Sequence, residues 1–246
     1  MNDAELAREI AETAGKLLVD LQRSGRFEGK ALGREGDLLA NAFIMEALRK
    51  QRPGDAILSE EEHDDPARLN ASRVWIVDPL DGTREYGEGR TDWAVHVALA
   101  IDGQPAIGAV ALPGLGATLC SGQPVAPPRN EGKLHMVVSR TRPAPEAITV
   151  AEKLGAEIVP MGSAGAKAMA VVRGEADIYL HSGGQYEWDN CAPAAVALAA
   201  GLHVSRIDGS PLRYNQPDSY LPDILICPKE LVDPVMHILN EAKTAS

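Results

Sequence analysis

The stretch WIVDPLDGTREY, residues 75–86, decides how the rest of the sequence is interpreted. Three apolar, strand-forming residues run directly into two aspartates, Asp78 and Asp81, with Pro79 between them. Asp-Gly after an apolar run is a common turn signal, so a simple chain reversal is the plainest interpretation. Pro79, however, fixes its own φ angle and holds both carboxylates in a defined relation. Two rigid carboxylates repel each other unless a cation lies between them, which makes a metal site the working hypothesis.

The composition is that of an acidic globular protein. The chain has 246 residues, of which 45% are hydrophobic and 24% charged, so a sizeable core can form. The net charge of −11 argues against non-specific binding to nucleic acid or anionic membranes, and 4% aromatic residues argue against a surface that stacks bases. Three scattered cysteines predict free thiols. Without an apolar signal segment or a run of ~18 apolar residues, the sequence predicts a cytoplasmic protein.

Strand and helix patterns alternate along the chain. Apolar spacing predicts helices over residues 3–23, 36–50, 145–155, 163–174, 188–201 and 229–243. Strands are predicted over residues 56–59, 73–78, 93–101, 106–112, 117–121, 134–139, 157–161, 176–180 and 223–227. This alternation predicts an α/β fold, a layered sandwich with α+β character in two closely packed halves.

The segment 122–133 is rich in proline, glycine and charge, and it is the predicted boundary between the two halves. The N-terminal half, residues 1–133, would carry the metal-binding motifs. The C-terminal half, residues 134–246, would carry substrate contacts and the last metal ligand.

Four acidic residues lie at the exit of a predicted strand or the start of a predicted helix: Glu60, Asp78, Asp81 and Asp189. Each acidic motif also has a plainer interpretation, because residues 60–62 could form a solvated acidic loop and Asp189 could cap the following helix. Together they match the oxygen ligands that a hard cation such as Mg²⁺ prefers. The six histidines are dispersed, which argues against zinc.

Gly82 and Thr83, directly after the second aspartate, suit a phosphate group. Gly82 lets backbone N–H groups approach an anion, a helix starting there would point its positive end at it, and Thr83 could orient a water. Other phosphate chemistries lack their residues: no Gly-Lys is followed by Ser or Thr, and no arginine lies six residues after a cysteine. Pro79 stands where D-x-D-G-T phosphatases carry their nucleophile. Metal-activated water, without a covalent intermediate, remains.

At this point the sequence resembles the inositol monophosphatase superfamily of metal-dependent, lithium-sensitive phosphatases. The matching motifs, in the family's order, are SEE (59–61), WIVDPLDGT (75–83), GSAGAKAMAVVRGEADIYL (162–180) and WDNCAP (188–193). The resemblance implies the αβαβα sandwich of the sugar phosphatases. Within the superfamily, DGTREY and MVVSRTR (136–142) are similar to the CysQ-type branch, whose members hydrolyse 3′-phosphoadenosine 5′-phosphate (PAP).

The resemblance implies two Mg²⁺ ions, or three. Glu60, Asp78 and the carbonyl of Leu80 would hold one ion, and Asp78, Asp81 and Asp189 would hold the second. The pair of ions would stabilise the attacking and leaving oxygens of an in-line displacement.

The resemblance also assigns the catalytic and substrate-binding residues. Glu60 and Thr83 would be catalytic, because they would orient and deprotonate the attacking water. The implied substrate contacts are Asp81, Gly82, Thr83, Ser139, Arg140, Gly162, Ser163 and Asp189. Arg140 and Arg142 could instead be a pair of solvated surface arginines.

One segment departs from the family pattern. The long mobile loop of the inositol branch is shortened here to ALGREGD, residues 31–37, with Asp37 left as a supporting acid behind the ligands. Actinobacterial-type members share this shortening and accept several small phosphate esters.

The leading hypothesis is therefore a Mg²⁺-dependent 3′(2′),5′-bisphosphate nucleotidase that converts PAP, and also its sulfated counterpart PAPS, by removing the 3′-phosphate. The nearest alternative is an inositol monophosphatase or fructose-1,6-bisphosphatase using the same site. A non-catalytic phosphate or metal sensor is the alternative of another class. The resemblance also implies lithium inhibition, a small phosphorylated substrate, a place in sulfur assimilation and a homodimer.

Overall fold

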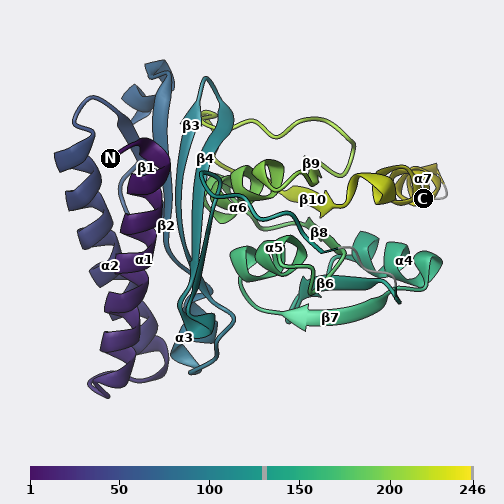
Figure 1. Cartoon of the computed structure of the whole chain (residues 1–246), viewed down its shortest axis with the longest axis horizontal. Coiled ribbons are helices and arrows are strands. Elements are labelled where there is room, and N and C mark those ends of the chain that lie inside the picture. Colours follow the sequence, from purple (N-terminus) through teal and green to yellow (C-terminus); the bar gives the residue numbers. More distant parts are fainter. Residues whose placement is uncertain (129–131, 245–246) are drawn as a thin grey trace.

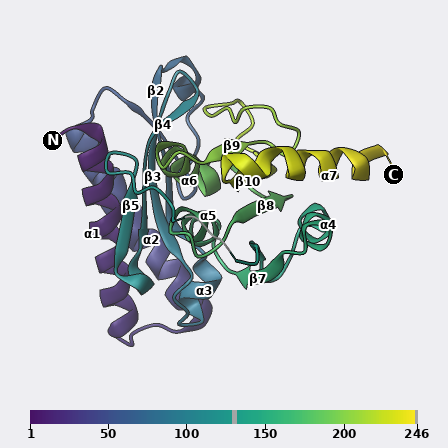
Figure 2. The same cartoon turned by 45° about the vertical axis from the view of Figure 1, so that its right-hand side comes forward.

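Two five-stranded sheets organise the molecule, seen in a computed structural model that describes residues 1–128 and 132–244. Helices α1 and α2 cover the outer face of the first sheet, and α5 and α6 lie between the two sheets (Figure 1). Helices α4 and α7 cover the outer face of the second sheet, an arrangement that a turned view preserves (Figure 2). The predicted αβαβα layering is confirmed.

The first sheet has the strand order β1-β2-β3-β4-β5. Its strands are β1 (Ala56–Ser59), β2 (Arg73–Asp81), β3 (Ala94–Ile101), β4 (Gln104–Leu112) and β5 (Ala117–Cys120). Only β1 and β2 pair in parallel, and the other neighbours are antiparallel. The helices of this part are α1 (Asp3–Arg23), α2 (Gly29–Gln51) and the single turn α3 (Thr83–Gly87), with 3₁₀ turns at Pro66–Asn70 and Pro113–Leu115.

The second sheet has the order β7-β6-β8-β10-β9. Its strands are β6 (His135–Ser139), β7 (Glu157–Met161), β8 (Ile178–Ser182), β9 (His203–Ser205) and β10 (Asp223–Cys227). Strand β6 pairs in parallel with β7 and β8, whereas β10 is antiparallel to both of its neighbours. The helices are α4 (Pro145–Leu154), α5 (Ala164–Val172), α6 (Glu187–Ala199) and α7 (Val232–Thr244), and a 3₁₀ turn, Lys229–Leu231, precedes α7.

The alternation of side chains along β2 directs its residues to two different cores. Trp75 and Val77 pack with α1 and α2, whereas Val74 and Ile76 pack with the central helices. Because side chains on a strand alternate between faces, Asp78 shares the face of Val74 and Ile76. The last residues of this buried strand therefore meet the central helix layer, where the second half of the chain contributes its own polar groups.

Small residues allow the central layer to fit between the sheets. The core around α5 and α6 is rich in alanine. A Cβ atom on Gly108 of β4 would overlap the backbone of Ala192 in α6, so glycine is required for this close approach. The two sheets are thus joined by closely packed helices, α5 and α6, and both helices belong to the second of the two proposed halves.

Most predicted elements are present, and the differences have local causes. The predicted helix 36–50 begins earlier, at Gly29, so the segment 31–37, which was interpreted as a shortened loop, is helical: that interpretation is wrong. Strand β2 continues through Pro79 to Asp81, beyond the predicted turn. The short strand β9 was not predicted. The three cysteines are buried free thiols, and no helix in the described part of the chain is long and apolar enough to cross a membrane.

The buried guanidinium of Arg68 joins the 3₁₀ turn before β2 to the segment before β10. Its side chain is 1% exposed and pairs with Asp64 at 2.6 Å. It also donates to Asn215 Oδ1 at 2.8 Å and to the carbonyl of Gln216 at 3.1 Å. Planar guanidinium donors suit such a divided set of acceptors better than an ammonium does.

Arg68→Ala is expected to lower the free energy of unfolding by about 2 kcal/mol, because the part-buried hydrogen bonds to Asp64, Asn215 and Gln216 are lost. The unfolding free energy of Arg68→Lys should lie between those of the wild type and Arg68→Ala, since lysine keeps the charge but lacks the planar set of guanidinium donors. Denaturant unfolding measures both. The control is Lys16→Ala, because the exposed Lys16–Glu12 pair should contribute less than about 0.5 kcal/mol. Equal losses at Arg68 and Lys16 would contradict the assigned role.

Candidate active site

Three carboxylates from both halves of the chain meet at the end of β2. Asp78, Asp81 and Asp189 each have an oxygen atom that lies within 4.8 Å of the others. Asp78 is 1% and Asp81 7% exposed. The first two come from β2 and the third from the first turn of α6. In the part of the chain that the structure describes, this is the cluster of three side chains that could hold a metal ion.

Asp78 is the most strongly perturbed acid of this cluster. Its complete burial, together with the nearby charges of Glu60, Asp81 and Asp189, raises its pKa well above the usual value. Its Oδ1 accepts a hydrogen bond from the backbone N–H of Leu80 at 3.1 Å, which fixes the orientation of the side chain. A buried carboxylate among like charges is destabilising unless a positive charge compensates it.

Asp81 is held by the N-terminus of α5 and by a histidine. Its two oxygens accept from the backbone N–H of Ala164 at 3.1 Å and of Gly165 at 2.6 Å. His96 Nε2 lies 3.2 Å from Asp81 Oδ2. Burial acts to raise the pKa of Asp81, but His96, Lys167 and the Gly165 amide outweigh it, so the net shift is downward. The carboxylate therefore stays ionised and fixed in direction.

His96 lies behind the cluster, next to Asp81. In the register of β2 and β3, His96 lies opposite Asp78, and it is fully buried. Its Nδ1 lies 3.0 Å from the carbonyl of Trp188, which can only accept, so Nδ1 carries a proton. Burial opposes protonation, yet Asp81 raises the pKa of the imidazole.

Asp189 caps α6 and also lies in the acidic cluster. Its Oδ2 accepts from the backbone N–H of Tyr186 at 2.7 Å, so it caps α6, and the same carboxylate lies in the cluster. Burial and then the charge of Asp81 raise its pKa to about 7. The helix start thus aims a carboxylate from the second half at the two aspartates of β2.

Glu60, Asp37 and Thr83 surround the open side of the cluster. Glu60 is an exposed residue, but its carboxyl group shares a hydrogen bond with Asp78, and its pKa is raised by burial and by neighbouring acids. Asp37, buried on α2, lies beside Thr83, and burial raises its pKa to about 7. The Thr83 hydroxyl lies 3.1 Å from the carbonyl of Leu80, to which it donates.

Next to the cluster lies a pocket of about 180 Å³ that is lined by seven of the eight predicted substrate contacts, whereas Thr83 lines a different hollow. Its lining includes Asp81, Gly82, Ser139, Arg140, Gly162, Ser163 and Asp189. Some of these groups already have partners. Arg140 donates to Glu85 and Glu88 at 2.7 and 2.9 Å, and the N–H of Gly162 donates to Asp92 at 2.7 Å. Ser163 Oγ accepts from the backbone of α5, as an N-cap does.

The sequence analysis missed two cations, His96 and Lys167. Lys167 is 4% exposed, and its ammonium donates to the carbonyls of Gly162 and Ser163. Burial lowers its pKa to about 8, against the opposing influence of Asp81 and other acids. A lysine within an alanine-rich helix was the available signal, because a buried lysine requires local partners.

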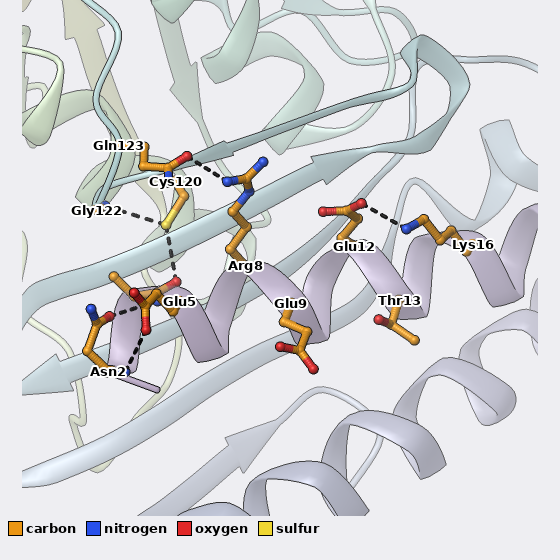
Figure 3. Close-up of a pocket in the computed structure, with 11 residues that line it drawn as sticks. Asn2, Glu5, Arg8, Glu9, Glu12, Thr13, Lys16, Cys120, Gly122 and Gln123 are labelled. Carbon is orange, nitrogen blue, oxygen red and sulfur yellow. Dashed lines mark hydrogen bonds and ion pairs between the residues drawn. The ribbon is translucent and has the colours of Figure 1, made fainter.

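Other hollows differ from this site. Figure 3 shows a pocket of about 410 Å³ along α1, in which Arg8 bonds Gln123 at 2.6 Å and Lys16 bonds Glu12 at 2.8 Å. Three glutamates and two cations line it, and among the described residues none of these glutamates belongs to a group that could hold a metal ion. A larger hollow of about 1150 Å³ is lined by Asp37, Thr83 and surface cations of α2.

The chain is similar to a known protein family and to proteins of named activity. A family model described as the inositol monophosphatase family matches residues 4–240. A Mycobacterium leprae protein named 3′-phosphoadenosine 5′-phosphate phosphatase is 50% identical over 256 aligned residues, covering 98% of this chain and 94% of its own length. A Shigella flexneri protein named 3′(2′),5′-bisphosphate nucleotidase CysQ is 32% identical over 199 residues, covering 75% of this chain and 80% of its own length.

A solved structure is also similar. CysQ from Bacteroides thetaiotaomicron, described as a bacterial member of the inositol monophosphatase family, superposes with a TM-score of 0.79 at 26% identity. The match covers 92% of this chain and 97% of that one.

Gly165→Ala is expected to reduce both activity and stability, because its Cβ would overlap His96 Nε2 and lie 3.1 Å from Ala94 Cβ. Displacing the buried imidazole should cost about 1–3 kcal/mol of unfolding free energy. Thermal unfolding and phosphate-release assays measure the two effects. Gly54→Ala is the matched control, since nothing lies within 4 Å of the added carbon. Unchanged stability and activity in Gly165→Ala would refute the tight contact.

Proposed function

This chain belongs to the inositol monophosphatase family, as its motifs predicted, and from that premise we propose that it is a phosphatase that hydrolyses the 3′-phosphate of PAP to give AMP. The observation that carries the proposal is the cluster of Asp78, Asp81 and Asp189 beside a pocket that also contains arginine and lysine side chains. The similar proteins named PAP phosphatase and bisphosphate nucleotidase favour PAP over sugar phosphates.

The residues present fit a hard divalent cation. The donors are carboxylate and carbonyl oxygens, which Mg²⁺ prefers, and like charges buried together require positive charge. We propose two Mg²⁺ ions, held by Asp78, Asp81 and Asp189 together with Glu60 and the carbonyl of Leu80. When bound, Mg²⁺ neutralises charge on the transferred phosphoryl group and makes a water nucleophilic at neutral pH.

The side chains around the cluster act on that water. Thr83 and Glu60 orient it, and the Glu60 carboxylate accepts its proton. The hydrogen bond that Thr83 donates to the carbonyl of Leu80 fixes the direction of its hydroxyl, and Asp37 lies beside it. The carbonyl of Leu80 accepts from Thr83 and has a second lone pair, so it can also serve as a ligand.

The rest of the pocket binds the phosphorylated substrate. N–H groups of Gly82 and Thr83 would contact the transferred phosphoryl group, where Gly82 has the positive φ of 89° that glycine accommodates. Arg142 lines the same pocket, and no ion pair of its guanidinium is found in the described residues. Because Arg140 already has two carboxylate partners, Arg142 is the better cation for a second phosphate of the substrate.

Phosphate release with Mg²⁺ from PAP, inositol 1-phosphate and fructose 1,6-bisphosphate tests the proposed function. We expect kcat/KM for PAP to exceed the others by at least about tenfold, the ratio that one additional hydrogen bond to a charged group gives. PAP as the poorest substrate would contradict the proposed function while leaving the metal chemistry intact. Mg²⁺ binding with no turnover of any ester would favour a sensor.

Asp78→Asn is expected to lower kcat by about 100-fold or more, because a charged ligand of both ions is lost. In the presence of a chelator, however, the same variant should melt at a higher temperature than the wild type, since one of the repelling buried charges is gone. The control is Asp102→Asn on an exposed turn, where φ is 49° and asparagine is well tolerated. Activity near the wild-type level in Asp78→Asn would refute the site.

A further inference from the structure

Two buried polar side chains in the pocket wall have no partner for one of their atoms. His181 at the end of β8 is 6% exposed and Gln185 just before α6 is 4% exposed. Both line the pocket that also contains Asp81 and Asp189. His181 Nδ1 and Gln185 Oε1 lack a hydrogen-bond partner. Buried polar atoms are nearly always paired, so two unpaired ones on residues that line the same pocket indicate a ligand.

The contacts of His181 decide which kind of atom it presents. Its Nε2 lies 2.7 Å from the carbonyl of Gly183, which can only accept, so Nε2 carries the proton. Burial, together with the charges of Lys167 and Arg142, lowers the pKa of His181 to about 4, so the ring is neutral at pH 7. Its Nδ1 is therefore a hydrogen-bond acceptor.

Gln185 presents an acceptor as well. Its amide nitrogen donates to the hydroxyl of Tyr179 at 2.8 Å, and this bond is buried. The remaining oxygen, Oε1, is the atom without a partner. The amide is held in place because Tyr179 is itself buried.

Two cations, Arg142 and Lys167, line the same pocket. Arg142 reaches Gly184, since a Cβ built there would lie 3.3 Å from Arg142 Nη1. Lys167 is bonded to the carbonyls of Gly162 and Ser163. A phosphate oxygen is an acceptor and would be repelled by two acceptor atoms, so phosphate groups belong with the cations and not against His181 and Gln185.

We propose that His181 and Gln185 determine specificity by accepting hydrogen bonds from uncharged N–H or O–H groups of the leaving part of the substrate. The inference rests on the proposed function, which makes that leaving part a nucleotide. Its donors are the amino group of the base and the free hydroxyl of the ribose. A substrate without such a donor leaves two buried acceptors unpaired, and a site of this kind rejects it strongly.

The experiment compares PAP with its 2′-deoxy analogue and with its inosine analogue, in which a carbonyl replaces the amino group. We measure kcat/KM for the wild type, His181→Phe and Gln185→Leu. Ser182→Ala is the control, because the Ser182 hydroxyl donates to Glu146 outside the pocket lining. Melting temperatures establish that each variant is folded. The inhibition constant of inorganic phosphate establishes that each variant still binds phosphate.

In the wild type, at least one analogue should react about tenfold more slowly than PAP. That penalty should disappear in the variant that lacks the matching acceptor, whereas Ser182→Ala keeps it and the phosphate inhibition constant stays within about twofold in all variants. If both analogues react as fast as PAP, or if the penalty persists in both variants, the inference is overturned. Failure of the wild type to hydrolyse PAP, with turnover of inositol 1-phosphate, overturns the proposed function and this inference with it.

Discussion

Like charges buried together at the end of β2 are the constraint on which the rest of the site depends. Asp78 is fully buried among other acids and has a raised pKa, whereas Asp81, at the same strand end, has a lowered one. The difference follows from the partners of Asp81, which are two amides at the start of α5 and the ring of His96. The protein thus compensates one carboxylate with its own groups and leaves the other in need of a cation.

That arrangement requires the two halves to pack closely. Asp189 and the first turn of α5 come from the second half, yet they contact aspartates of the first sheet. Gly165 permits this, because any side chain there would occupy the position of His96 Nε2. The alanine-rich central layer is therefore more than packing between sheets, since it brings a helix start and a carboxylate to the strand end.

The sequence predicted the features that are local and missed those that depend on contacts. Asp78 and Asp81 follow a run of strand-forming residues, so their place at a strand end could be predicted. The first turns of α2 could not, because Gly33 and Gly36 disfavour a helix. In the structure these glycines face Thr83 and Tyr86 so closely that larger residues would overlap them, and packing outweighs propensity. His96 gave no pattern, because only the pairing of β2 with β3 sets it opposite Asp78.

Charge alone is a weak basis for substrate choice in this pocket. Arg84 and Arg140 line it, but both pair with Glu88, and Arg140 also pairs with Glu85. In a protein of net charge −11, the remaining cations attract any small phosphate ester without distinguishing a nucleotide from a sugar phosphate. Discrimination between them therefore depends on neutral groups that match particular donors, because an unmatched buried acceptor costs more than a matched one contributes.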